Sequence, residues 1–212
     1  MFFLQGLYDW LEQLAGGRYN HFWLVHLSFR SLDKALQVYL FWIIYRLIYL
    51  LRKKSKQEIV RKNKEIILWL FVFYVILLYQ LTVFRWGFNF STAFEQLRSL
   101  DHVNWQPFVE TLKLTNGLTL FDFIYNLFGN IFWFVPMGLM LPALLKKSKQ
   151  IKTLLIGFGV SLSIEVMQFI FQTGISDIDD VIFNTLGTLL GLLVFSGISW
   201  VKNKVKNRLK ED

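Results

Sequence analysis

The chain has 212 residues, of which 54% are hydrophobic and 18% aromatic, with no cysteine and a net charge of +8. This composition is too apolar for an ordinary soluble domain, and the lack of cysteine excludes disulfides, thiolate ligands and thiol nucleophiles. The positive charge does not indicate nucleic-acid binding, because the lysines and arginines form short runs between long apolar stretches. The chain is therefore predicted to be an all-α integral membrane protein.

The first predicted element is a short amphipathic helix within residues 2–14. Phe3, Leu7 and Leu11 recur at helical spacing, with acidic and amide side chains between them. The segment is too short to span a bilayer, so we expect it to lie at the membrane interface. Residues 1–34 are predicted to form an extracellular N-terminal segment. No basic leader precedes an apolar core, so no removable signal peptide is expected.

Five apolar stretches follow, each close to the roughly 20 residues that a helix needs to cross the hydrocarbon. They cover residues 35–51, 66–84, 123–145, 153–173 and 181–201. These stretches predict a bundle of about five transmembrane helices. The first stretch contains Arg46, whose long side chain is expected to snorkel to the nearby interface.

The basic residues predict the orientation of the bundle. They gather after the first stretch, after the third stretch and in the tail, which all lie on one side if five helices alternate. Because such loops face the cytoplasm, we expect a multi-pass protein of the cell membrane with its N-terminus outside and its C-terminus in the cytoplasm. Beyond the N-terminal segment, the predicted parts are a first transmembrane helix with a basic cytoplasmic loop (35–65), a transmembrane domain (66–200) and a basic cytoplasmic tail (201–212).

Polar residues in the last three stretches share helix faces, because residues three or four positions apart lie on the same side of a helix. The sets at this spacing are Asn126 with Asn130, Ser161 with Glu165 and Gln168, and Asp180 with Asn184. The predicted helix directions bring all three faces to the outer half of the membrane. The sequence therefore predicts a polar pocket that opens outward.

Glu165 is the strongest candidate for a functional residue. A carboxylate at the centre of an apolar helix costs roughly 2.5 to 3.5 kcal/mol on insertion scales, and neither packing nor capping requires one there. Arg85, at the outer end of the second stretch, is the nearest basic candidate to neutralise Glu165 or to bind an anionic head group. The candidate ligand-binding residues are Arg85, Asn126, Asn130, Glu165, Gln168, Asp177, Asp180 and Asn184.

Structural alternatives stand beside these functional interpretations. Asn, Gln and Ser side chains join membrane helices by hydrogen bonds worth roughly 0.6 to 2 kcal/mol. Ser176 and Asp179 form an S-x-x-D capping box for the last helix, and Gly187 and Gly191 form a G-x-x-x-G pattern typical of close helix packing. Three aspartates with Glu165 offer the oxygen ligands that hard cations take. Their D-x-D-D spacing is common, however, and no metal or other cofactor is predicted.

Four segments carry a resemblance to a known family. They are N-W-Q-P-F at 104–108, N-L-F-G-N-I-F-W-F-V-P-M-G-L at 126–139, S-L-S-I-E-V-M-Q at 161–168 and D-I-D-D-V-I-F-N-T-L-G-T-L-L-G at 177–191. In this order they resemble the VanZ family of bacterial membrane proteins over roughly residues 70–195, which implies a VanZ-like transmembrane domain at 66–200. In that family an arginine often precedes the last acidic positions. Here residues 174–176 have none, which shifts the expected basic role to Arg85.

The resemblance implies a role at the Gram-positive envelope, with membrane lipids as partners. The founding member of the family is associated with low-level resistance to teicoplanin, a lipoglycopeptide that binds the D-Ala-D-Ala end of peptidoglycan precursors. The leading hypothesis is a non-enzymatic protein whose pocket binds the lipoglycopeptide, lipid II or lipoteichoic acid. One alternative is an intramembrane enzyme that modifies an envelope lipid or teichoic acid, with Glu165 as general base and Asp177 to Asp180 binding a metal. Another is a scaffold for cell-wall proteins.

Overall fold

The regular elements in the described part of the chain are helices, which confirms the predicted all-α class. The computed structural model describes residues 1–15, 22–85, 99, 101, 103–109, 120–146 and 149–211. Five of its helices are long and apolar enough to cross a membrane, as the apolar stretches predicted. The chain divides into two compact units, Met1–Glu95 and Gln96–Asp212.

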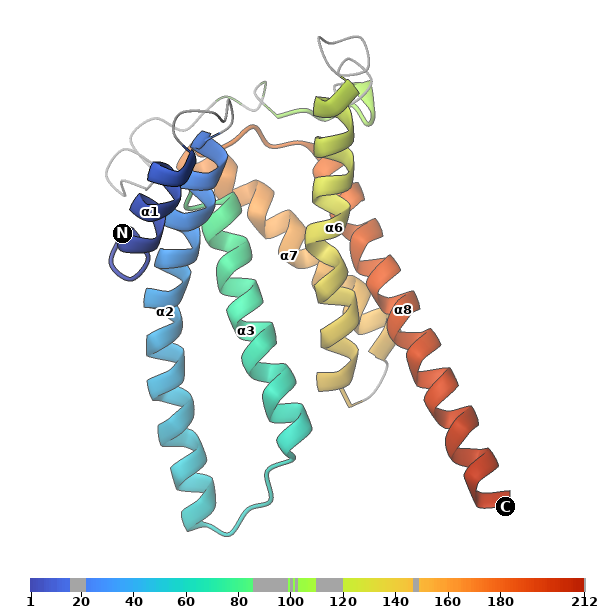
Figure 1. The fold of residues 1–212 in the computed structure, drawn as a ribbon. Helices are drawn as coiled ribbons and strands as arrows, with labels where there is room; N and C mark the ends of the chain where they lie inside the picture. The colour runs from blue at the N-terminus through green and yellow to red at the C-terminus, as the bar shows by residue number, and fades with distance from the viewer. Residues whose placement is uncertain are drawn as a thin grey trace. The chain divides into compact units, whose positions relative to one another are not determined.

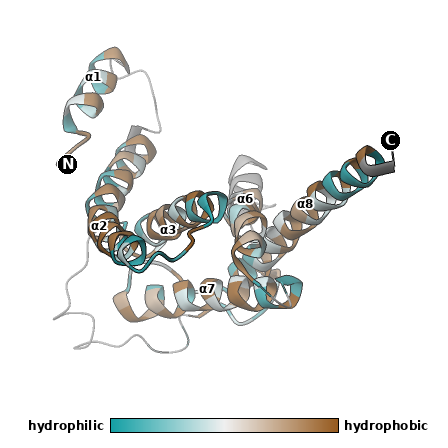
Figure 2. Ribbon diagram, turned by 90° about the horizontal axis from the view of Figure 1, so that it is seen from below, coloured by the Kyte–Doolittle hydropathy of each residue, from teal (hydrophilic) through white to brown (hydrophobic). Residues whose placement is uncertain are grey.

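The first unit contains α1 (Gln5–Ala15), α2 (Phe22–Ser55) and α3 (Lys62–Thr82). Figure 1 shows α2 and α3 as an antiparallel hairpin whose connection carries basic residues. The helix α2 begins well before the apolar stretch at residue 35, and its 34 residues exceed the roughly 20 that cross the hydrocarbon. Figure 2 shows hydrophobic residues along most of both helices and hydrophilic ones at their connection.

The carboxylate of Asp33 attaches α1 to α2. Its two oxygens accept hydrogen bonds from the backbone N–H groups of Phe2 at 2.7 Å, Phe3 at 2.6 Å and Leu4 at 2.9 Å. The side-chain amide of Gln37 donates a further bond at 2.8 Å. Because N–H groups at the start of a helix lack intrahelical partners, the buried Asp33 acts as a cap supplied from another helix.

The two sides of α1 differ as the amphipathic pattern predicts. Tyr8 is buried, with its ring 5.3 Å from that of His26 on α2. Leu7, Trp10 and Leu14 are exposed on another face. This helix therefore presents apolar side chains on one face while Asp33 holds its first residues, and its location at the membrane interface stays a prediction.

Replacing Asp33 with alanine is expected to release α1 from α2. A hydrogen bond to a charged group contributes roughly 1.5 to 3 kcal/mol, and the substitution removes three that hold the start of the helix. Hydrogen–deuterium exchange on the detergent-solubilised protein should show faster exchange over residues 1–15. Asp9→Ala is the matched control, because within the described residues Asp9 accepts its hydrogen bond locally, from Gln5 of α1. Equal protection in both variants would contradict the anchoring role.

Arg46 forms an ion pair with Glu65 of α3, a partner that the snorkelling prediction did not include. Its Nε donates to Oε1 at 2.5 Å and its Nη2 to Oε2 at 2.6 Å, so the pair is bidentate. The indole N–H of Trp69 donates to the same carboxylate at 2.9 Å, and the guanidinium lies 4.5 Å from the ring centre of Tyr49. A charge removed from water needs such a partner, and α3 supplies one within reach of Arg46.

The second unit contains α6 (Leu120–Leu144), α7 (Lys149–Phe171) and α8 (Ile178–Glu211), each in contact with the other two. In Figure 1, α6 and α8 run side by side from the start of α8, and α8 continues past the end of α6. Residues 201–211 of the predicted cytoplasmic tail are therefore helical. Its last turns are hydrophilic in Figure 2, in contrast to the apolar turns before them.

Small residues let α6 and α8 approach closely. A Cβ atom placed on Gly187 would lie 2.1 Å from the carbonyl oxygen of Ile131, and one on Gly191 would lie 2.1 Å from that of Val135. No side chain fits at such distances, so the backbones of the two helices are in direct contact. The close-packing interpretation of the G-x-x-x-G pattern is confirmed. This contact holds the first turns of α8 next to the polar face of α6.

Candidate functional site

The turn between α7 and α8 begins with a sharp end to α7. The N–H of Thr173 donates to the carbonyl of Gln168 at 3.1 Å, and the N–H of Gln172 donates to that of Phe169 at 3.4 Å. This pair of bonds is a Schellman motif. Gln172 occupies its left-handed position, with a φ of 55°. The motif stops α7 close to Glu165 and turns the chain back toward α8.

Asp177 is the N-cap of α8. Its Oδ1 accepts a hydrogen bond from the N–H of Asp179 at 2.9 Å, as an N-cap side chain does for the second helical residue. The predicted S-x-x-D pattern placed the cap one residue earlier, at Ser176. The hydroxyl of Ser176 instead donates to the carbonyl oxygen of Glu165 at 2.7 Å, because the turn directs this buried side chain back onto α7.

Glu165 holds the acidic turn against α7. Its side chain is buried, with 6% of the residue exposed, and its Oε2 accepts a hydrogen bond from the N–H of Asp177 at 2.9 Å. Its carbonyl oxygen accepts the bond from Ser176. Glu165 thus contacts the turn through both its carboxylate and its backbone. This donor to its carboxylate is a backbone group of the turn, which the sequence pattern could not reveal.

Residues 103–109 pack on the same turn. The N–H of Asn104 donates to the carbonyl of Ser176 at 2.9 Å, and the carbonyl of Asn104 accepts from the N–H of Ile178 at 3.1 Å, which forms a parallel β-bridge. The side-chain amide of Asn104 donates to Oδ2 of Asp177 at 3.0 Å. Asn104 therefore satisfies groups at the start of α8 that would otherwise lack partners.

Phe108, the last residue of the N-W-Q-P-F segment, also contacts α8. Its N–H donates to Oδ1 of Asp179 at 2.7 Å, and Asp179 is buried with 1% of its surface exposed. The ring of Phe108 lies 6.2 Å from that of Phe183 on α8. Its φ of 65° is uncommon for a bulky residue. The hydrogen bond and the ring contact hold Phe108 in this conformation.

Two side-chain pairs connect the helices around the turn. The amide of Asn130 on α6 donates to Oδ1 of Asp180 on α8. The amide of Asn184 on α8 donates to the hydroxyl of Ser161 on α7 at 2.9 Å, and both groups are buried. The polar faces of α6, α7 and α8 therefore meet, as the sequence predicted from helical spacing and helix direction.

These contacts define one polar cluster at the acidic end of the second unit. Its members are Asn104, Phe108, Asn130, Ser161, Glu165, Ser176, Asp177, Asp179, Asp180 and Asn184. Gln168 lies buried beside the cluster and ends α7 through its carbonyl. The side chain of Asn126 lies outside the described residues. Arg85 belongs to the first unit, so its role as a basic partner of Glu165 stays a prediction.

Sequence reasoning did not select Asn104, Phe108 and Ser176 as site residues. Asn104 and Phe108 lie in a loop, where no helical spacing connects them to α8. The signal that pointed to them was the N-W-Q-P-F segment, which is part of the family resemblance. Ser176 was interpreted as a helix cap, and its bond to the carbonyl of Glu165 depends on the path of the turn.

The carboxylates of the cluster accept hydrogen bonds from amide donors. Backbone N–H groups donate hydrogen bonds to Glu165 and Asp179, and asparagine side-chain amides donate to Asp177 and Asp180. Over the described ranges, no three His, Cys, Asp or Glu residues are grouped so that they could hold a metal ion. The arrangement can recognise a ligand by exchanging hydrogen-bond partners, and the divalent-cation alternative has no geometric support among these residues.

Comparisons with known proteins match this part of the chain. A family model described as VanZ/LLP1 matches residues 71–201, which contain the whole polar cluster. Among curated proteins, Protein VanZ of Enterococcus faecium is 33% identical over 144 residues, which cover 68% of this chain and 79% of that protein. No solved structure gives a significant match.

Proposed function

Because the chain belongs to the VanZ family and is a multi-pass membrane protein, we propose that it lowers the susceptibility of a Gram-positive cell to teicoplanin. The main support for a functional site is the polar cluster, in which side chains from three apolar helices and one loop meet. Buried polar groups inside a membrane bundle are expensive unless they serve pairing or function. The whole cluster lies within the family match.

The proposed ligand is amphipathic: the lipoglycopeptide itself, lipid II or the anchor of lipoteichoic acid. Exposed apolar residues flank the cluster, with Trp105 61% exposed and Ile175 66% exposed. They offer a surface for an acyl chain, and the carboxylate and amide groups beside them offer partners for hydroxyl and amide groups. Exchanging one hydrogen bond for another is nearly neutral in free energy. Specificity would then come from the pattern of donors and acceptors.

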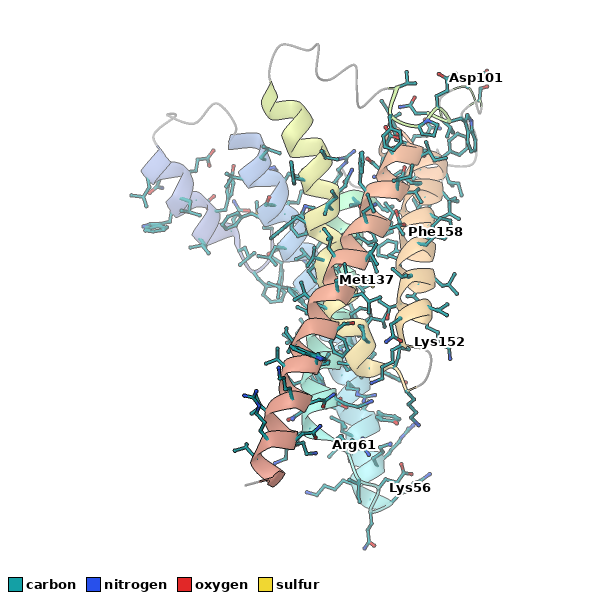
Figure 3. All side chains as sticks on the ribbon, turned by 90° about the vertical axis from the view of Figure 1, so that its right-hand side faces the viewer. Lys56, Arg61, Asp101, Met137, Lys152 and Phe158 are labelled. Carbon is teal, nitrogen blue, oxygen red and sulfur yellow. The ribbon has the colours of Figure 1, made fainter. Side chains whose placement is uncertain are left out.

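The proposed orientation places the polar cluster outside. Figure 3 shows Asp101 at the end of the second unit where α7 ends and α8 begins, whereas Lys152 lies at the opposite end of α7. Lysines at that opposite end, on α7 and on the last turns of α8, are typical of the cytoplasmic side. This supports an N-terminus outside, a C-terminus in the cytoplasm and a cluster that an envelope ligand reaches without crossing the membrane.

Drug susceptibility of a deletion strain tests this function. Complementation with the wild-type chain is expected to raise the minimal inhibitory concentration of teicoplanin severalfold and to leave that of vancomycin, which lacks the lipid tail, nearly unchanged. Expression of the chain should be verified in the membrane fraction. Equal teicoplanin susceptibility with and without the chain would refute the proposal.

A further inference from the structure

The second unit has a groove at its basic end, away from the polar cluster. The groove has a volume of about 620 Å³ and lies between the first residues of α7 and the middle of α8. It is lined by Lys149, Gln150, Phe195, Ser196, Ser199, Trp200, Lys202 and Asn203. A volume of this size suits a small-molecule ligand, for which sites of roughly 300 to 1,000 Å³ are usual.

The lining of the groove matches a phosphodiester. Lys149 and Lys202 supply positive charge from two different helices, and none of the described residues that line the groove is acidic. The sequence extends this charge, because residues 145–152 and 200–210 contain nine lysines and arginines and no acidic residue. Serine hydroxyls and the amides of Gln150 and Asn203 add hydrogen-bond donors. Together these groups can neutralise a phosphate and bind its oxygens.

The position of the groove points to a lipid rather than a soluble anion. Along α8 the sequence changes from apolar to basic at Lys202, and Trp200 beside it is 63% exposed, as aromatic residues at a membrane interface are. Phe195, more than one turn deeper along α8, gives the groove an apolar end. A ligand here would place its head group near the lysines and its acyl chains along the apolar turns of α8.

We propose that this groove binds the head group of an anionic phospholipid, such as phosphatidylglycerol, in the leaflet that the basic loops face. The site is separate from the polar cluster and does not depend on the proposed function. A charge-assisted hydrogen bond from a lysine to the phosphate contributes at least roughly a tenfold change in affinity. Loss of both groove lysines should therefore weaken binding by roughly 100-fold.

The test uses the full-length protein purified in a neutral detergent, with phosphatidylglycerol or phosphatidylcholine added in mixed micelles. Bound lipid is counted by native mass spectrometry, and the shift in Tm is measured in parallel. The groove variant is Lys149→Gln with Lys202→Gln. The control variant is Lys206→Gln with Arg208→Gln, which removes the same charge from α8 outside the groove. Both pairs are exposed or half-buried, so both variants should fold.

The proposal expects phosphatidylglycerol to bind and to raise the Tm of the wild-type and control proteins, with much weaker binding to the groove variant. Phosphatidylcholine and inorganic phosphate should produce little effect on any of them. If the groove and control variants lost phosphatidylglycerol binding equally, the lipid would be held by unspecific charge attraction, and the proposed site would be refuted. A Tm shift with inorganic phosphate as large as that with phosphatidylglycerol would identify a soluble anion as the ligand and overturn the lipid assignment.

Discussion

Replacing Gly187 with alanine is expected to lower the unfolding free energy of the protein substantially. A methyl group at this position would lie 2.1 Å from the carbonyl oxygen of Ile131, so α6 and α8 must separate to admit it. Overpacking costs about 1 to 3 kcal/mol, and more where backbone must move. The better helix propensity of alanine returns only about 1 kcal/mol. Thermal unfolding in detergent should show a Tm several degrees below that of the wild type.

Gly197→Ala is the matched control for this prediction. Gly197 lies on the same helix, and a Cβ atom placed there meets nothing within 4 Å. The gain in helix propensity is then not opposed by a clash, so the Tm should stay unchanged or rise. If the two variants were equally stable, the close contact between α6 and α8 would be refuted.

Alanine and glutamine at position 165 are expected to have different effects. Glu165→Ala removes the acceptor for the N–H of Asp177 and leaves that half-buried donor without its partner, at a cost of about 1 to 3 kcal/mol. Glu165→Gln keeps one acceptor oxygen for this bond and replaces the other carboxylate oxygen with an NH2 group. It should therefore remain within about 1 kcal/mol of the wild type. Thermal unfolding in the same detergent measures both differences.

Val166→Ala controls for side-chain truncation on α7. Val166 is the next residue along the helix and is exposed on the surface of the unit, so its loss should change the Tm little. Should Glu165→Ala prove as stable as Glu165→Gln, the bond to the acidic turn would contribute nothing to the fold. Glu165 would then need another explanation for its place in an apolar helix.

Much of the second unit could be predicted from the sequence, because the patterns that indicate its helices and their polar faces involve residues close together in the chain. Long apolar stretches predicted the membrane helices, and residues three or four positions apart predicted which polar side chains share a face. Asn130, Glu165 and Asn184 were selected in this way, and the structure joins each of them to a neighbouring helix or turn. The spacing of Gly187 and Gly191 likewise predicted a close helix contact.

The remaining features depend on residues far apart in the chain. Asp33 caps the start of α1 from about thirty residues away, and nothing in its local pattern suggests that role. Arg46 has a partner on α3 because the hairpin brings Glu65 within reach, whereas sequence reasoning considered only the helix that carries Arg46. Asn104 lies in a loop without periodicity. In each case the backbone groups or the partner become apparent only when the tertiary structure is known.

The most direct test of the polar cluster is the teicoplanin susceptibility of a deletion strain that carries Glu165→Gln, compared with the wild-type chain at equal membrane abundance. This substitution preserves an acceptor for the bond that holds the turn and removes the buried carboxyl group. We expect the variant to be folded but to lose the protection that the wild type gives, with the susceptibility to vancomycin unchanged. Full protection by a folded Glu165→Gln protein would contradict the assignment of the activity to this cluster.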